Sequence, residues 1–149
     1  MSERVLYSGY KKCTTLKYEV AVCAQTGVPI AFNGPFAGPT SDITIFRKKL
    51  KKTMILHGLL GLADGTYQGE GALLLVPPRP YSSLDPNMRD FYRRCARKRI
   101  LSENLFSRTK SFAILSTKFR HDLSLHRSCF KFILNIICID LEFYPLRIK

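Results

Sequence analysis

Side chains alternate along residues 12–23, and this alternation constrains the fold more than any other feature of the chain. Threonine, leucine, tyrosine and valine fall on one face, whereas charged residues, Glu19 among them, fall on the other. A period of two with many β-branched residues is typical of a β-strand. Residues 24–27 have turn composition, and residues 28–33 form a second extended stretch. We therefore predict a hairpin, followed by a glycine- and proline-rich loop over residues 34–39.

A helix is expected after this loop. Thr40 or Ser41 can cap a helix that begins near Asp42, and apolar residues follow at helical spacing as far as Met54. The other face of this helix is rich in lysine.

The remaining chain contains two predicted strands and two predicted helices. Short apolar runs at residues 59–63 and 72–76 suit buried strands. Asp85 followed by proline is a strong helix start, and this basic helix should run to about Thr109. A last apolar helix is expected over residues 126–143. The residues expected to be buried on these two helices are Met88, Phe91, Cys95, Ile100, Leu101, Leu105, Phe130, Ile133, Ile136 and Ile137.

The order of these elements favours a mixed α/β or α+β fold, and 149 residues suit one domain spanning residues 1–149.

The most unusual feature of the composition is a net charge of +13, from 24 lysines and arginines against 11 acidic residues. Such an excess favours a polyanionic partner, above all DNA or RNA, although a merely basic protein would show it too. The candidate nucleic-acid-binding residues are Lys48, Lys49, Lys51, Lys52, Arg93, Arg94, Arg97 and Lys98. Alternatively, these residues form solvated helix faces that bind no partner.

The five cysteines are widely spaced and include no Cys-x-x-Cys pair, which argues for reduced thiols. The first twelve residues have no apolar core of a signal peptide. The longest apolar stretch, residues 129–141, is too short to span a bilayer. We therefore expect a nuclear or cytoplasmic protein that is neither secreted nor membrane-bound. His126 and Cys129 lie one helical turn apart, but two ligands do not make a zinc site.

Two acidic residues stand at places where a carboxylate could serve chemistry. Asp64 ends a predicted strand and precedes a glycine, so its side chain could face a cleft. Glu103 lies within the basic helix, where Arg99 and Arg108 are candidate ion-pair partners. By themselves these positions are ordinary, because an aspartate at a strand end usually forms a turn and a helical glutamate is usually a solvated ion-pair partner.

Three segments in order carry a family resemblance: Tyr-Ser-Gly-Tyr-Lys-Lys at residues 7–12, Leu-Ala-Asp-Gly-Thr-Tyr at residues 62–67, and Ser-Glu-Asn-Leu-Phe-Ser-Arg-Thr-Lys at residues 102–110. They resemble parts of the DDE endonuclease domain of PIF/Harbinger-type transposases. A Gly/Pro loop that ends in an acid opening a helix, and the Tyr-Pro-Leu-Arg ending at residues 144–147, also resemble that family. The resemblance covers nearly the whole chain.

The resemblance implies an RNase H-like fold, a mixed sheet flanked by helices, that cleaves DNA phosphodiesters and transfers strands. Its acidic residues would hold divalent cations, Mg²⁺ or Mn²⁺, with Asp64 and Glu103 as catalytic metal ligands. Asp42 matches a recurrent acidic position of the family and is a weaker ligand candidate. The alternative is that Asp42 is simply an acidic residue at a helix N-terminus, where the helix dipole favours negative charge. DNA would be the partner, and a separate Myb-like protein often supplies sequence-specific binding.

The chain departs from this family at its start. The family's first catalytic aspartate lies on a strand before the Tyr-Ser-Gly segment, and here only residues 1–6 precede it. Glu3 and Glu19 are the candidates for a substitute. We therefore expect an N-terminally truncated, partial RNase H-like domain without its first strand, inactive or impaired as a nuclease. The alternatives are a non-catalytic basic module that binds nucleic acid, and a fragment that does not fold stably by itself.

Overall fold

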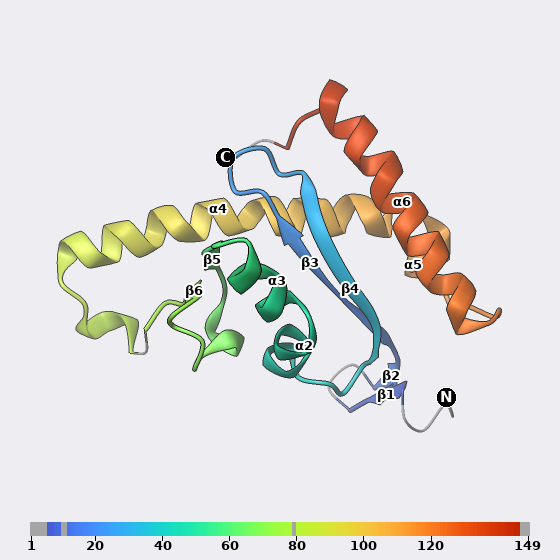
Figure 1. The fold of residues 1–149 in the computed structure, drawn as a ribbon, viewed down its shortest axis with the longest axis horizontal. Coiled ribbons are helices and arrows are strands. Elements are labelled where there is room, and N and C mark those ends of the chain that lie inside the picture. The colour runs from blue at the N-terminus through green and yellow to red at the C-terminus, as the bar shows by residue number, and fades with distance from the viewer. Residues whose placement is uncertain (1–5, 10–11, 79, 147–149) are drawn as a thin grey trace.

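The computed structural model of the protein describes residues 6–9, 12–78 and 80–146. Within them, six strands form three separate two-stranded sheets (Figure 1). The short strands β1 (Tyr7–Ser8) and β2 (Cys13–Thr14) pair antiparallel, as do the longer strands β3 (Leu16–Val22) and β4 (Pro29–Ala37). The strands β5 (Gly61–Leu62) and β6 (Leu74–Leu75) pair in parallel. The mixed α/β class is therefore confirmed, whereas a single RNase H-like sheet is not seen in this part of the chain.

The predicted hairpin is the β3–β4 ribbon, and it is longer than expected. The predicted loop at residues 34–39 instead continues strand β4 to Ala37. Gly34 permits this path because its φ is +132°, and a side chain there would come within 2.8 Å of the Tyr18 ring. The pairing register shifts between Lys17 and Glu19, a local irregularity of the bulge type.

The helices confirm two predicted start signals and correct one predicted helix. Helix α2 (Asp42–Lys48) is capped by Ser41, but it ends at Lys49, where the backbone leaves helical geometry before α3 (Leu50–Leu56). The one helix expected to reach Met54 is therefore two. The remaining helical elements are η1 (Gly65–Tyr67), η2 (Tyr81–Ser83), α4 (Pro86–Lys110), α5 (Ala113–Ser116) and α6 (Leu123–Phe143). Asp85 caps α4 as predicted, and α6 begins three residues earlier than predicted because Asp122 caps it.

Helices cover both faces of the β3–β4 ribbon. Figure 1 shows α2 and α3 on one side of the ribbon, α6 on the other, and α4 crossing behind it. Each side has its own core. One joins α4 and α6 to the ribbon, and its buried members are Leu105, Ile133, Ile137 and Leu141. The other joins α2, α3 and β6, and its buried members are Phe46, Met54 and Leu74.

The prediction that α4 buries one face along its whole length is wrong for the first half of the helix. Met88 is 40% exposed and Phe91 is 38% exposed, whereas Leu101 and Leu105 are buried as expected. Figure 1 shows the reason, since the N-terminal half of α4 extends past the β3–β4 ribbon and α6. The periodicity of apolar residues therefore predicted the helix correctly. It predicted the burial of these residues correctly only where other elements cover the helix. None of the helices in the described part of the chain is long and apolar enough to cross a membrane.

A buried carboxylate ties the second core together. Glu70 accepts from Arg47 Nε at 2.6 Å and from Lys51 Nζ at 2.9 Å. These two cations lower the pKa of the Glu70 carboxyl, which keeps it ionised and paired. Because Arg47 belongs to α2 and Lys51 to α3, the pair fixes both helices against the segment that leads into β6.

Leu105 offers the clearest test of the first core. Its side chain is fully buried among α4, α6 and the ribbon, so Leu105→Ala should lower the free energy of unfolding by about 3 kcal/mol. Urea unfolding followed by circular dichroism measures this change. Leu60→Ala is the matched control, because Leu60 is 81% exposed and its truncation should change stability by less than about 0.5 kcal/mol. Equal effects of the two changes would contradict the core described here.

Candidate functional site

Asp64 lies where strand β5 leads into η1, as the sequence predicted. The backbone N–H of Ala63 donates to Leu75 O, which extends the β5–β6 pairing to the residue before Asp64. The Asp64 side chain is exposed and caps η1, because its Oδ1 accepts from the Thr66 backbone N–H at 2.8 Å and from the Thr66 hydroxyl. One carboxylate oxygen therefore serves the turn, and the other has no partner among the described residues.

Glu103 lies on α4, one helical turn after Arg99 and on the same side of the helix. Arg99 Nη1 donates to Ala63 O at 3.5 Å, a contact between residues 36 positions apart. This contact brings the α4 turn before Glu103 to the residue before Asp64. Arg108, the other expected partner of Glu103, instead pairs with Asp140 at 2.6 Å. The exposed Glu103 carboxylate therefore has no ion-pair partner in the described part of the chain.

Asp42 occupies the first turn of α2, and its carboxylate is already paired. Lys17 Nζ donates to Asp42 Oδ1 at 3.1 Å and to Thr40 O at 2.9 Å. This lysine joins strand β3 to the start of α2. The arrangement agrees with the plain role considered for Asp42, an acidic residue at a helix N-terminus.

Tyr67 shows that three acidic residues share one neighbourhood. Burial raises the pKa of its phenol well above the ordinary value, and the negative charges of Glu19, Asp42 and Asp64 raise it further. The Tyr67 ring also meets Phe46 edge-on, with ring centroids 5.9 Å apart, which anchors it in the second core. Carboxylates from β3, α2 and the end of β5 therefore all act electrostatically on one half-buried phenol.

Glu19 is the least expected member of this group. It is only 8% exposed, and neither of its carboxylate oxygens has a hydrogen-bond partner among the described residues. Burial raises the pKa of the Glu19 carboxyl from 4.5 to about 7, and the negative charge of Asp42 contributes to this rise. Asn33, its cross-strand neighbour, likewise has an unpartnered buried Nδ2.

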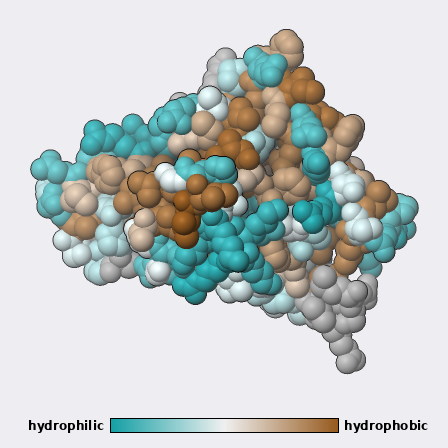
Figure 2. Space-filling model, in the orientation of Figure 1, coloured by the Kyte–Doolittle hydropathy of each residue, from teal (hydrophilic) through white to brown (hydrophobic). Residues whose placement is uncertain are grey.

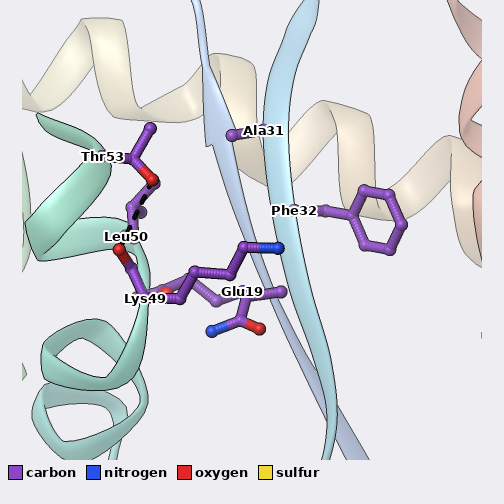
Figure 3. A pocket seen from close by; sticks show the side chains of 7 residues that line it. Glu19, Ala31, Phe32, Lys49, Leu50 and Thr53 are labelled. Carbon is purple, nitrogen blue, oxygen red and sulfur yellow. Dashed lines mark hydrogen bonds between the residues drawn. The ribbon is translucent and has the colours of Figure 1, made fainter. Parts of the chain in front are cut away.

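Glu19 and Asn33 line a small cavity between the ribbon and the helices. Lys49, Leu50 and Thr53 close it from the helix side, and its volume is about 20 Å³. Figure 3 shows Lys49 extending from the helix side towards the ribbon, while Phe32 points away from the cavity. Glu19 was predicted on the polar face of its strand. No local pattern reveals its burial, because α2 and α3 cover that face.

The acidic residues fit poorly as ligands of one divalent ion. Oxygen ligands must converge to about 2.0–2.6 Å from Mg²⁺ or Ca²⁺. No group of three or more histidine, cysteine, aspartate or glutamate side chains in residues 6–9, 12–78 and 80–146 lies close enough together to hold a metal ion. Asp42 is held by Lys17, and Asp64 is held by Thr66. The role of metal ligand therefore stays a prediction for Asp42, Asp64 and Glu103, because the structure does not bring their carboxylates together.

The candidate DNA-contacting residues differ in how far they are available. Arg93, Arg97 and Lys98 are exposed on α4 and have no ion-pair partner among the described residues, and Arg94 pairs loosely with Asp90 at 3.6 Å. In the lysine cluster, Lys51 is engaged by Glu70, and Lys48 Nζ lies 5.3 Å from the centroid of the Phe36 ring. Lys49 borders the small cavity, and Lys52 is exposed.

A family model described as DDE superfamily endonuclease matches residues 1–139. This match extends over almost all of the chain and includes Asp42, Asp64 and Glu103. Searches of curated proteins and of solved structures found no match.

The buried Glu19 carboxyl should make the protein less stable as pH rises. The pKa of Glu19 is higher in the folded protein than in the unfolded chain, so the folded state binds more protons between pH 4.5 and about 7. The free energy of unfolding is therefore highest below pH 4.5, and this stabilisation of the folded state is lost as pH rises through about 7. The full loss corresponds to about 3 kcal/mol. Glu19→Gln should remove this dependence and raise the free energy of unfolding at pH 8.

Urea unfolding at a series of pH values from 5 to 8 measures this effect. The control is Glu103→Gln, which removes the charge of an exposed glutamate and leaves Glu19 in place, so the pH dependence caused by Glu19 should remain. If the wild-type slope persisted in Glu19→Gln, the burial described for this carboxyl would be wrong.

Proposed function

This chain belongs to the DDE superfamily endonuclease family, and we propose that it is a PIF/Harbinger-type transposase domain that binds DNA through helix α4 but does not cleave it unaided. The family assignment supports a transposase-like nuclease ancestry. The finer subtype rests on the ordered segments at residues 7–12, 62–67 and 102–110. The DNA-binding part rests on exposed cations. The lack of unaided cleavage rests on the acidic residues of the described part of the chain, no three of which lie close enough together to hold a metal ion.

The observation that carries the proposal is the row of exposed cations on the N-terminal half of α4. Arg93 and Arg97 lie one helical turn apart, as do Arg94 and Lys98, so each pair points to the same side. Figure 1 shows this half of the helix extending past the ribbon and α6. Lysines and arginines that contact phosphates release counterions and give affinity without sequence readout.

Cleavage by this superfamily generally uses divalent metal ions, which activate the attacking oxygen and stabilise the leaving one. The Arg99–Ala63 contact brings together the segments that carry Asp64 and Glu103, but two acidic residues are not a complete ligand set. Glu19 faces the small cavity instead of joining them. We therefore assign Arg99 a positioning role and derive no catalytic step for this chain.

The proposal also includes partners and location. Because phosphate contacts carry no sequence information, target choice would come from a separate DNA-binding protein, of the Myb-like type that the family resemblance suggests. A protein that binds DNA would act in the nucleus.

Removing two arginines from α4 should weaken DNA binding. Arg93→Gln with Arg97→Gln should lower affinity for a random-sequence duplex, and the slope of log affinity against log salt should become shallower by about 2, because each lost phosphate contact removes about 0.9. Fluorescence anisotropy at several salt concentrations measures both quantities. Arg120→Gln with Arg127→Gln is the charge-matched control, since both arginines are exposed outside α4. An equal loss in the control would show that net charge, not α4, governs binding.

Plasmid relaxation tests for cleavage. The purified chain with Mg²⁺ or Mn²⁺ should leave supercoiled plasmid intact, at protein concentrations where anisotropy shows DNA to be bound. Asp64→Asn provides the check on contamination, because nicking that persists in this variant does not come from this site. Nicking by the wild-type chain that disappears in Asp64→Asn would overturn the non-cleaving part of the proposal.

A further inference from the structure

Helix α6 is apolar on two sides, and the described residues of the chain cover only one of them. Its buried side faces the ribbon and α4 through Phe130, Ile133, Leu134, Ile137 and Leu141. On the other side, Phe132 is 66% exposed, Ile139 is 61% exposed and Phe143 is 72% exposed. Figure 2 shows apolar surface along the part of the molecule where Figure 1 places α6. A helix needs only one apolar side to join its own core.

The exposed apolar residues follow the spacing of a coiled-coil seam. Phe132, Ile136, Ile139 and Phe143 are separated by four, three and four positions, which is the alternation of the two core positions of a heptad. We call these four residues the α6 seam. Ile136 is half-buried, and the seam covers roughly 17 Å of helix at 1.5 Å per residue. Figure 1 shows α6 along the outer edge of the molecule, on the side of the ribbon away from α2 and α3.

Charged residues border the seam in a way that distinguishes the two possible directions of pairing. Lys131 and Glu142 are exposed on the same outer border of α6, near opposite ends of the seam, with the polar Asn135 between them. In an antiparallel pair of identical helices, each Lys131 would face Glu142 of the second copy. In a parallel pair, this border would instead face the opposite border of the second helix, so Lys131 and Glu142 would not meet.

We propose that two copies of this chain associate through the α6 seam in an antiparallel, two-fold arrangement. Phe132 of one copy packs near Phe143 of the other, and Ile136 packs near Ile139 across the axis. A two-fold axis makes every contact occur twice, so the Lys131–Glu142 attraction is doubled. This surface does not suit DNA, because its centre is apolar and carries no phosphate-binding cation.

A second exposed apolar patch does not support a comparable inference. Ile55, Leu56, Leu59 and Leu60 gather at the end of α3 and before β5, where Figure 2 shows an apolar surface. These residues lack heptad spacing, and no complementary charges border them in a way that selects a partner. The patch nevertheless supplies a matched control, since its residues are as exposed as those of the seam.

Analytical ultracentrifugation of the whole chain between about 1 and 100 μM tests the association, because a short helical interface should give micromolar affinity. The wild-type chain should show a reversible monomer–dimer equilibrium. Phe132→Ser with Ile139→Ser should give a monomer with an unchanged circular dichroism spectrum and unfolding midpoint. Ile55→Ser with Leu56→Ser should dimerise like the wild type. A wild-type chain that stays monomeric, or a seam variant that still dimerises, would overturn the proposal.

Charge exchange tests the direction of pairing. Lys131→Glu alone and Glu142→Lys alone should each weaken dimerisation about tenfold, because each change replaces two attractions with two repulsions. The double variant Lys131→Glu with Glu142→Lys should recover wild-type affinity. Since both residues are exposed, these variants leave the core intact. Failure of the double variant to recover would refute the antiparallel arrangement.

Discussion

The β3–β4 ribbon is the element on which both cores depend. An isolated two-stranded hairpin is marginally stable in water, so this ribbon needs cover on both faces. On one face the Tyr18 ring stacks on Phe130 with centroids 3.8 Å apart, and its hydroxyl meets His126 Nδ1 at 2.8 Å. Burial lowers the pKa of His126, which favours the neutral form of this ring in its contact with Tyr18. On the other face, Glu19 of the ribbon lies against α2 and α3. The same hairpin therefore contributes to the packing of the protein and to the group of acidic residues that act on Tyr67.

Local sequence signals predicted the elements well because each has a local physical cause. The caps Ser41 and Asp85 accept hydrogen bonds from the first helical turn, and the alternating strand needs no distant information. Burial was predicted less well, because it depends on what lies opposite. Met88 has the same apolar character as Leu101, but only Leu101 meets a partner element. The break at Lys49 is a further case, since the lysine-rich sequence there gives no signal to stop a helix.

The elements that carry the candidate site residues were predictable from the sequence, but the arrangement of these residues was not. Asp64 and Glu103 lie on the expected elements, and the Arg99–Ala63 contact links their segments, yet sequence spacing could not show that Lys17 holds Asp42. Glu19 was weighed only as a substitute ligand. Its burial arises from packing between residues more than 20 positions apart, because α2 and α3 close over strand β3. Its roles in stability and in the electrostatics around Tyr67 therefore emerge only from the assembled fold.

The high net charge affects the two proposed interactions in opposite directions. A charge of +13 attracts DNA to α4 but repels a second copy of the same chain. Added salt screens both effects, so it weakens phosphate binding and relieves repulsion between copies. The α6 seam is apolar, and burial of apolar surface does not depend on screened charge. Bound DNA neutralises the same cations locally, as salt does. In the proposed arrangement, contact with DNA would therefore favour pairing of two copies, and the chain's basic character would restrain pairing mainly when DNA is absent.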